Sequence, residues 1–230
     1  MKVLVVSATA LEIAPTLKQL GVELPSASAG AAASIAVGDS ARCDFLITGV
    51  GQFLCGVHLV QHLSLHSYDF VIHAGIAGSF ADNLPKRSRV VVSREVFGDL
   101  GAEDNGSFLS IQQMGLLAPD EPPFVAGALH APEVSLLCLS DLLRVSSVTV
   151  NRVLSEERSI EWVRATFSPS VVHMEGAALF YVLLARKVPF VSLRTISDIV
   201  GPRNKASWDI AGAVSELNLL LGEVLSELLN

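Results

Sequence analysis

Short apolar runs rich in β-branched residues alternate along this chain with longer segments in which apolar residues recur every three to four positions. A run at 2–7 precedes a periodic segment at 10–20, and a run at 190–196 precedes another at 209–229. Short runs of this kind predict strands, and periodic segments predict helices. Their alternation favours an α/β fold with a largely parallel central sheet.

The remaining elements follow the same two patterns. Strands are also expected at 33–37, 43–48, 69–73, 89–97, 144–150 and 171–174. Helices are also expected at 52–66, at 156–166 with Ser155 as its N-cap, and at 176–186. Frequent Gly and Pro and poor periodicity leave 98–135 without a predicted element. No segment rich in Pro, Ser and Gly separates two halves, so we expect one domain over 1–230, with a central mixed sheet flanked by helices.

Composition excludes several classes of protein. Half of the residues are hydrophobic and 17% are charged, which excludes a disordered chain. The net charge of −7 disfavours nucleic acid and anionic membranes as partners, because both need concentrated Lys and Arg. The three cysteines form no CxxC motif, which fits a reducing compartment. The apolar run at 3–6 is far shorter than the roughly 7–15 residues of a signal peptide, so we expect a cytoplasmic protein.

Three carboxylates lie at or just past the ends of predicted strands. Glu12 follows the first run, Glu175 follows 171–174, and Asp198 follows 190–196. Ligands of α/β sheets bind outside the carboxyl ends of the strands. Three acids brought to that edge from distant parts of the chain predict an acid/base site.

Each of these acids also has a purely structural explanation. Glu12 is an ordinary acid in the first turns of a helix, and Glu175 favours the dipole of the helix that it begins. Asp198 precedes a loop with Gly201 and Pro202, where a turn-forming Asp is common. The functional alternatives are a carboxylate at Glu175 that accepts hydrogen bonds from two neighbouring hydroxyls, and a proton donor at Asp198 whose pKa is raised by burial or by a nearby charge.

Two further patterns are partial matches to a metal site and to a dinucleotide site. Histidines recur every four residues at His58, His62 and His66, but no acid follows His58, so we expect a solvated polar stripe and no metal. The segment 49–51 and Asp69 resemble a dinucleotide fingerprint, but the third glycine is missing and Asp69 begins a strand instead of ending one. We therefore predict no dinucleotide and no other cofactor.

The segment 73–79, rich in small residues, follows the predicted strand at 69–73. It is expected to be either a tight turn or a loop whose backbone N–H groups face a sugar or an anion.

In order and spacing, four parts of the chain resemble the nucleoside phosphorylase and nucleosidase superfamily in its hydrolytic branch. These are Glu12, the segment 74–78, the run Met174-Glu175-Gly176-Ala177-Ala178 and the tripeptide Ile196-Ser197-Asp198. Within that branch, the segments 97–104, 149–151 and 201–208 are most similar to the futalosine hydrolases of the alternative menaquinone pathway.

The resemblance implies that water cleaves the N-glycosidic bond of futalosine and releases hypoxanthine. It implies catalytic roles for Glu12, which activates the water, and Asp198, which protonates the purine. The substrate-binding residues that it implies are Glu175, Met174, Ser197, Ala77, Gly78, Val150 and Asn151. It also implies a small-molecule purine nucleoside as partner and a homodimer. Two alternatives are a nucleosidase for methylthioadenosine, S-adenosylhomocysteine or aminodeoxyfutalosine, and a nucleoside-binding protein without turnover.

Two details of the substrate bear on charged residues. The segment 8–12 contains no Arg or Lys, and a carboxylate beside the nucleophile repels phosphate, so water is the expected nucleophile. The carboxylate at the 5′ end of futalosine needs a cation, for which Arg203, Lys205 and Arg152 are the candidates nearest in sequence to the site segments. The donor that distinguishes hypoxanthine from adenine is not identified from the sequence.

Overall fold

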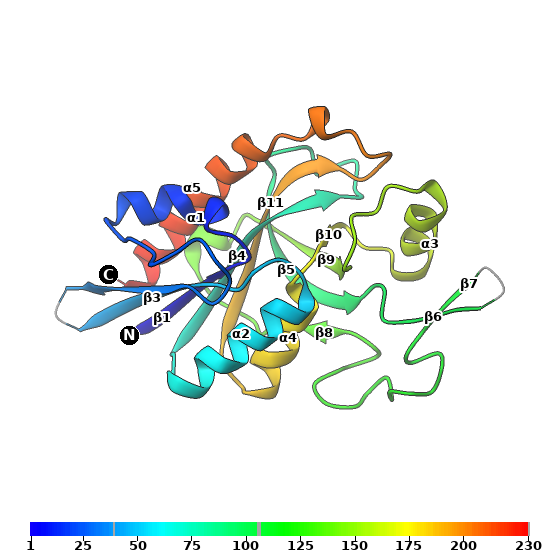
Figure 1. Cartoon of the computed structure of the whole chain (residues 1–230), viewed down its shortest axis with the longest axis horizontal. Coiled ribbons are helices and arrows are strands. Elements are labelled where there is room, and N and C mark those ends of the chain that lie inside the picture. The colour runs from blue at the N-terminus through cyan, green and yellow to red at the C-terminus, as the bar shows by residue number, and fades with distance from the viewer. Residues whose placement is uncertain (39, 105–106, 230) are drawn as a thin grey trace.

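A computed structural model describes residues 1–38, 40–104 and 107–229 (Figure 1). Its strands are β1 (Lys2–Ser7), β2 (Ala32–Val37), β3 (Ala41–Ile47), β4 (Phe70–Ser79), β5 (Arg89–Phe97), β6 (Gly101–Asp104), β7 (Ser107–Ser110), β8 (Leu129–His130), β9 (Leu143–Thr149), β10 (Val171–His173) and β11 (Phe190–Ile199). Its helices are α1 (Ala10–Gln19), α2 (Gln52–Leu65), α3 (Glu157–Phe167), α4 (Gly176–Ala185) and α5 (Ile210–Leu229), with short 3₁₀ turns η1 (Leu137–Leu139) and η2 (Lys205–Ser207).

The central sheet is mixed. Its strand order is β10-β9-β5-β11-β4-β1-β3-β2, with β8 added on β5. Strands β3, β1, β4 and β11 are mutually parallel, whereas β5 runs antiparallel to β11. Strand β10 also pairs with β4, so β4, β11, β5, β9 and β10 form a closed ring of strands. The predicted α/β fold with a central mixed sheet and flanking helices is confirmed.

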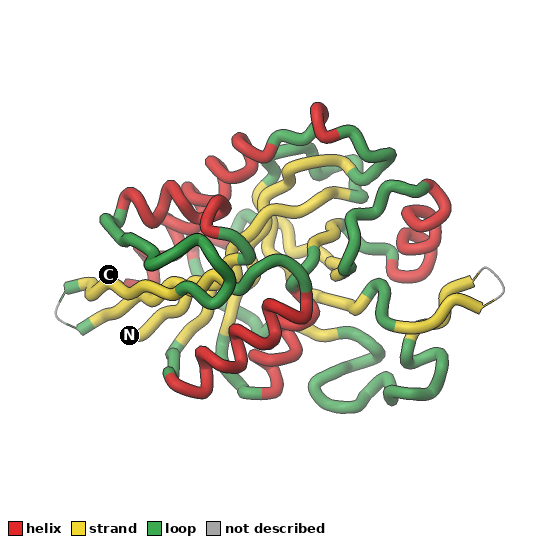
Figure 2. The backbone as a smooth tube through the Cα atoms, in the orientation of Figure 1, coloured by secondary structure: helices red, strands yellow, loops and turns green. Residues whose placement is uncertain are grey.

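Helices cover both faces of the sheet (Figure 2). The alternation of side chains along β1 sends Leu4 and Val6 toward α2 and α4, and Val3 and Val5 toward α1 and α5. On α5 the apolar residues spaced at 3.6 positions face the sheet, as the pattern predicts. They are Leu217, Leu220, Leu221, Val224 and Leu225. Burying a side chain of this size contributes roughly 1.5–3 kcal/mol, so these two packed layers fix the sheet on which the site is built.

Strand β4 is longer than the sequence predicts. The segment 73–79 continues the strand through Ser79, so the expected turn or loop there is wrong. Gly and Ala have low strand propensity, but here the backbone pairs with β11 on one side and with β1 or β10 on the other. Small residues in this stretch leave room for other side chains to approach the backbone of the strand.

Three smaller features complete the fold. The stretch 98–135 contains the hairpin β6–β7, which projects from the body of the molecule (Figure 1), and the short strand β8. The N-cap of α3 is Glu156 and not Ser155 as predicted. Among the described residues, no helix is long and apolar enough to cross a membrane.

Candidate active site

Glu12 lies in the first turn of α1 and reaches the backbone of β4. Its Oε2 accepts hydrogen bonds from the backbone N–H of Thr9 at 2.9 Å, from the Thr9 hydroxyl at 2.9 Å and from Ser7 Oγ at 3.2 Å. Its Oε1 accepts one from the N–H of Ile76 at 3.2 Å. A Cβ on Gly75 would lie 3.1 Å from that oxygen. One oxygen therefore stabilises the start of the helix, and the other faces the middle of β4.

Glu175 precedes α4 but makes no side-chain cap to it. Its Oε1 accepts a hydrogen bond from the N–H of Gly51 at 2.9 Å, and its Oε2 accepts one from Met174 at 3.2 Å. Gly51 has φ +95°, where a side chain would be strained, so the glycine segment 49–51 presents a donor to Glu175. Burial raises the pKa of Glu175, and the charge of Glu12 acts in the same direction.

Asp198 lies inside β11, at a break in its pairing with β4. Ile196 pairs with Ala77 and Asp198 with Gly78, so Ser197 is an extra residue that bends the strand and re-aims the side chain of Asp198. The hydroxyl of Ser197 lies 2.6 Å from Asp198 Oδ1 and 3.2 Å from the carbonyl oxygen of Ala77. Burial raises the pKa of Asp198, although the Ser197 hydrogen bond opposes the shift.

β4 relates the positions of two of the three acids. Glu12 contacts it at Gly75 and Ile76, and Asp198 at Gly78, two to three residues or roughly 7–10 Å further along. Glu175 is close enough to Glu12 for the two charges to interact. Glu12 and Glu175 therefore form a pair, and Asp198 lies further along the same strand.

Asp198 lines a cavity of about 160 Å³, which we call the Asp198 cavity. This volume is below the roughly 300–1,000 Å³ of pockets that enclose a whole ligand, so the cavity can hold one part of a ligand. Neither Glu12 nor Glu175 lines it. Its lining residues are Ile76, Ala77, Gly78, Val153, Leu154, Val172, Ser197, Asp198, Val200, Gly201, Arg203 and Trp208.

The predicted binding residues divide between this cavity and its surroundings. Ala77, Gly78 and Ser197 line the Asp198 cavity, and Met174 donates to Glu175. Val150 is buried and lines a different cavity, and Asn151 donates its side-chain amide to Asp99 at 3.1 Å. Neither of these two residues lines the Asp198 cavity, where Val153 and Leu154 stand instead.

Arg194 is a charged residue that the sequence prediction missed. It comes from the middle of β11, is 1% exposed, and lies with its guanidinium carbon 3.4 Å from the position of a Cβ on Gly75, beside Glu12. The carboxylates that act most strongly on its charge are Glu175 and Glu12. A single arginine inside an otherwise apolar strand was the available signal, because a buried charge needs partners.

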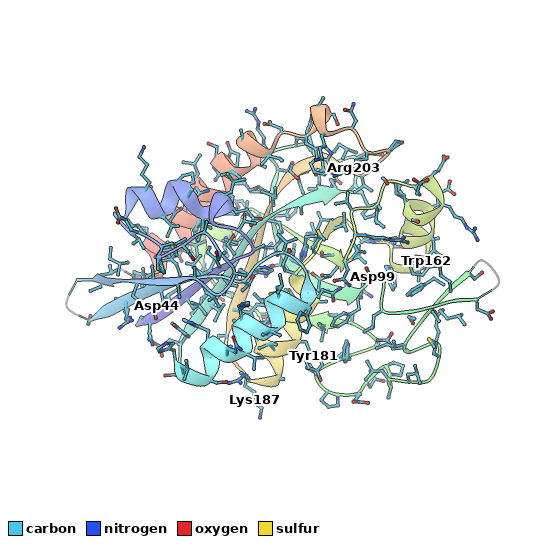
Figure 3. All side chains as sticks on the ribbon, viewed as in Figure 1. Asp44, Asp99, Trp162, Tyr181, Lys187 and Arg203 are labelled. Atoms are coloured by element: carbon cyan, nitrogen blue, oxygen red, sulfur yellow. The ribbon has the colours of Figure 1, made fainter. Side chains whose placement is uncertain are left out.

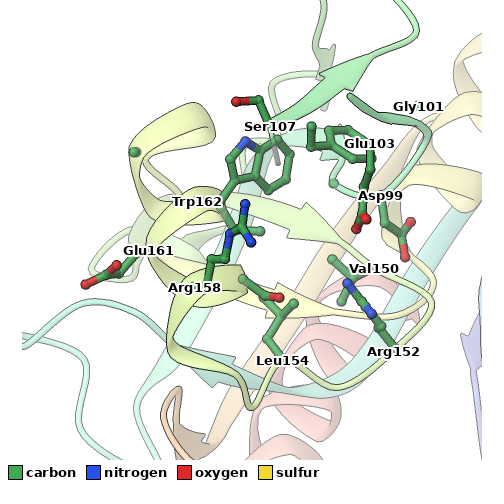
Figure 4. Close-up of a pocket in the computed structure, with 15 residues that line it drawn as sticks. Asp99, Gly101, Glu103, Ser107, Val150, Arg152, Leu154, Arg158, Glu161 and Trp162 are labelled. Carbon is green, nitrogen blue, oxygen red and sulfur yellow. The ribbon is translucent and has the colours of Figure 1, made fainter. Parts of the chain in front are cut away.

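The candidate cations are dispersed. Arg203 lines the Asp198 cavity and lies in the loop between β11 and η2, where Figure 3 labels it, and Lys205 begins η2. Arg152 lines a larger cavity of about 750 Å³ between α3 and the β6–β7 hairpin, where Figure 4 shows it with Asp99 and Trp162. Glu12, Glu175 and Asp198 do not line this larger cavity.

The histidine stripe of α2 makes ordinary structural contacts. His62 Nε2 lies 2.6 Å from the hydroxyl of Tyr68, which in turn donates to Asp44 at 2.7 Å. Within the described part of the chain, no group of three His, Cys, Asp or Glu side chains has the geometry of a metal site.

Comparison with characterised proteins gives relatives of two kinds. Futalosine hydrolase from Streptomyces coelicolor is 30% identical over 189 residues, covering 79% of this chain and 77% of that protein. A 5′-methylthioadenosine/S-adenosylhomocysteine nucleosidase from Bacillus subtilis is 30% identical over 168 residues, covering 71% of each.

Solved structures share the fold over nearly the whole chain. A methylthioadenosine/S-adenosylhomocysteine nucleosidase from Colwellia psychrerythraea in complex with adenine has a TM-score of 0.80 and 21% identity, covering 99% of this chain and 96% of that one. Futalosine hydrolase from Helicobacter pylori has a TM-score of 0.79 and 21% identity, covering 99% and 98%.

The predicted family resemblance is confirmed by a match over almost the entire chain. The family model described as "Phosphorylase superfamily" covers residues 2–229, which include all three acids and the strands that carry or contact them. The chain therefore belongs to the phosphorylase superfamily.

Proposed function

We propose that this protein hydrolyses the N-glycosidic bond of futalosine and releases hypoxanthine, a step of the futalosine route to menaquinone. The observation that carries the proposal is the position of Asp198, which lines the Asp198 cavity with a raised pKa and a hydrogen bond from Ser197. A carboxyl whose pKa is raised holds its proton closer to neutral pH and can donate it to a departing base. The relative from Streptomyces coelicolor supports futalosine as the substrate.

The acids divide the chemistry between sugar and base. With the base in the Asp198 cavity, the sugar lies over Gly75 and Ile76, between Glu12 and Glu175. Positive charge builds on the sugar as the bond breaks, as in other glycoside cleavages. Glu12 takes a proton from the attacking water, and Glu175 binds the 2′ and 3′ hydroxyls while its negative charge stabilises the cationic sugar.

Water is the nucleophile that suits this environment, even though Glu12 has a cation beside it. A cation does lie beside Glu12, because Arg194 reaches it from β11. However, the Nη atoms of Arg194 already contact the carbonyl oxygen of Leu193 and the rings of His73 and His173. The remaining N–H, at Nε, is buried, so a phosphate would meet two nearby carboxylates without an accessible donor from Arg194, which supports hydrolysis over phosphorolysis.

Arg203 supports hypoxanthine as the departing base. It lines the Asp198 cavity, and none of the described side chains forms an ion pair with it. A guanidinium donates hydrogen bonds and accepts none. It can therefore bind the 6-carbonyl oxygen of hypoxanthine, whereas the 6-amino group of adenine offers it no acceptor at that position.

The role of Arg203 is tested by comparing Arg203→Gln with Lys205→Gln, which removes a charge from the same loop. Futalosine and aminodeoxyfutalosine differ only in the base. We expect Arg203→Gln to lower the ratio of their kcat/KM values by about 10- to 100-fold, the equivalent of one hydrogen bond to a charged group, and Lys205→Gln to leave it unchanged. An equal loss for both substrates would instead place Arg203 at the 5′ carboxylate that they share.

A nucleosidase for methylthioadenosine, S-adenosylhomocysteine or aminodeoxyfutalosine is the second candidate. The relative from Bacillus subtilis favours it, and the three acids would serve adenine release equally well. A nucleoside-binding protein without turnover is less favoured, because binding alone requires only Glu175 among the three.

One experiment decides between these functions. The protein is incubated separately with futalosine, aminodeoxyfutalosine and methylthioadenosine, and the free base is identified by chromatography, with Asp198→Asn as the control. Hypoxanthine from futalosine, released fastest, supports the proposal. Faster release of adenine from either of the other two supports the second candidate, and binding without release from any substrate supports the third.

The family resemblance also leads us to propose a cytoplasmic homodimer. Sedimentation equilibrium of the purified protein tests the oligomeric state, for which a single species of twice the 24.4 kDa chain mass is expected.

A further inference from the structure

The guanidinium of Arg194 is a buried charge without a direct ion pair. Its side chain is 1% exposed, and no described carboxylate lies within ion-pair distance. A buried charge is costly unless hydrogen bonds and nearby opposite charges compensate it. The residues that provide this compensation therefore determine where the guanidinium can stay.

The partners of Arg194 are backbone oxygens and two histidine rings. Nη1 donates to the carbonyl oxygen of Leu193 at 2.8 Å. Nη2 lies 2.8 Å from Nε2 and 3.0 Å from Nδ1 of His73, and 3.3 Å from Nδ1 of His173. A protonated ring would bring a second positive charge within hydrogen-bond distance of this buried guanidinium, which itself has no acceptor. Both imidazoles must therefore be neutral.

The proton of His173 can be assigned from its neighbours. The N–H of Gly176, which can only donate, points to Nδ1 at 3.2 Å. The ring proton is therefore on Nε2, which lies 2.9 Å from Oε2 of Glu95, although the N–H is not well aligned with that oxygen. The other oxygen of Glu95 accepts a hydrogen bond from Thr149 Oγ1 at 2.9 Å.

Two further contacts connect this group to the active-site acids. The N–H of Ala177, in the first turn of the helix that follows Glu175, donates to Thr149 Oγ1 at 2.9 Å. A Cβ on Gly176 would overlap both the ring of His173 and the carboxylate of Glu95. Gly176 therefore leaves the space that the His173 ring and the Glu95 carboxylate occupy.

We propose that Glu95, His173 and His73 are positioning residues that hold the charge of Arg194 between Glu12 and Glu175. This inference rests on the proposed function, since it gives Arg194 its place in the nucleoside site. The Nε of Arg194 is buried and has no hydrogen-bond partner among the described residues. A fixed cation here reduces the repulsion between the two carboxylates, but displaced toward the sugar it would oppose the positive charge that forms there. Its position must therefore be held closely.

Other ionisable groups also face this group. The charge of Arg194 affects the pKa values of both rings. His73 also faces His173, and His173 also faces Glu95. Cys55 and the three glutamates face Arg194. Burial and the Arg194 charge lower the pKa values of His73 and His173, which agrees with neutral rings.

The kinetic test compares Glu95→Gln in the wild-type and Arg194→Gln backgrounds by steady-state assays. Gln keeps the size of the side chain but removes its charge. We expect kcat to fall about 100-fold in the wild-type background with little change in KM, the loss typical of a catalytic group misplaced by about 1 Å. In the Arg194→Gln background the same change should cost little more, because its effect passes through Arg194.

The matched control is Ser147→Ala, which alters a buried residue paired with Glu95 on the neighbouring strand but lacking a hydrogen-bond partner for its hydroxyl. It should leave kcat unchanged. An equal loss from Glu95→Gln in both backgrounds would assign Glu95 a purely structural role. Unchanged kcat in the wild-type background would overturn the proposal as well.

A spectroscopic readout needs no turnover. In ¹⁵N NMR at pH 7, the His173 ring, assigned by comparison with His173→Gln, should show an unprotonated Nδ1 and a protonated Nε2. A charged His173 ring, or one protonated at Nδ1, would refute the proposed positioning of Arg194 even in an active enzyme. A wild-type protein that cleaves no purine nucleoside would instead refute the proposed function, and the two failures are thereby separated.

Discussion

The two ends of the site are built differently. At the proposed sugar end, Glu12, Glu175 and Arg194 are all at most 8% exposed, and they form hydrogen bonds with backbone groups of β4, of Gly51 before α2, and of β11. At the proposed base end, Asp198 is half-buried, and the segment 202–207 beside it is exposed. The sugar is common to all candidate substrates, whereas the base and the 5′ group differ. The fixed end suits the shared chemistry, and the more open end suits selection among substrates.

Asp198→Asn should have the largest effect, because it removes the proposed proton donor at the open end. We expect kcat to fall by roughly 10²–10⁴-fold while the fold is kept, since Asn fits the same space and can still accept from Ser197. Steady-state kinetics with futalosine and circular dichroism measure the two properties. Near-wild-type turnover would remove Asp198 from the mechanism.

Glu12→Gln tests the fixed end. Gln can still accept the hydrogen bond from the backbone of Thr9, so α1 should remain stable, but it cannot take a proton from water. Turnover should fall by a similar or slightly smaller factor, about 10²-fold or more, with nucleoside binding retained in calorimetry. Loss of folding instead of turnover would make Glu12 a structural residue.

Glu175→Gln should have a smaller effect that depends on the sugar. We expect a substrate with both ribose hydroxyls to lose far more kcat/KM than its 2′-deoxy analogue, because the carboxylate accepts from both hydroxyls. The wild-type ratio between inosine and 2′-deoxyinosine is the reference. Equal losses would exclude recognition of the sugar by Glu175 and weaken the distinction between the two ends.

Sequence patterns pointed to the three acids but not to Arg194 and His73. The reason is the position of each residue relative to the apolar runs. Glu12, Glu175 and Asp198 each follow or end an apolar run, so strand patterns alone point to them. Arg194 lies within such a run, and its partner His73 was predicted to end the strand at 69–73, where a turn or loop was expected to begin. These positions depend on pairing between β4 and β11, which no local pattern encodes.

Part of the lining of the Asp198 cavity was also not predicted from the sequence. Val153 and Leu154 belong to an irregular segment between β9 and α3, where neither period applies. The β6–β7 hairpin has little buried surface, and therefore little apolar alternation to predict it. The fold was predictable because its strands and helices bury one or two faces, and the open end of the site was not because it is built from exposed, irregular segments.

The smallest predicted effect concerns stability and pH at the fixed end. The pKa values of His73 and His173 are lowered from 6.5 by burial and by Arg194. Below about pH 6.5 the unfolded chain binds protons at both rings while the folded chain does not, so stability falls as the pH decreases toward the folded pKa values, by at most about 1.4 kcal/mol per pH unit for each ring.

Urea unfolding of the wild type, His73→Asn and His173→Gln between pH 7 and pH 5.5 measures this slope, with the exposed His130→Gln as the control. A single cooperative transition is also expected if 1–230 is one domain. The two buried-site variants should lose part of the pH dependence, and the control should keep it. Carboxylates that titrate in this range contribute equally to all four proteins, so the differences isolate the two rings. Identical slopes throughout would mean that the rings bind protons in the folded protein as readily as in the unfolded chain, and the fixed end would then lack the neutral rings that Arg194 requires.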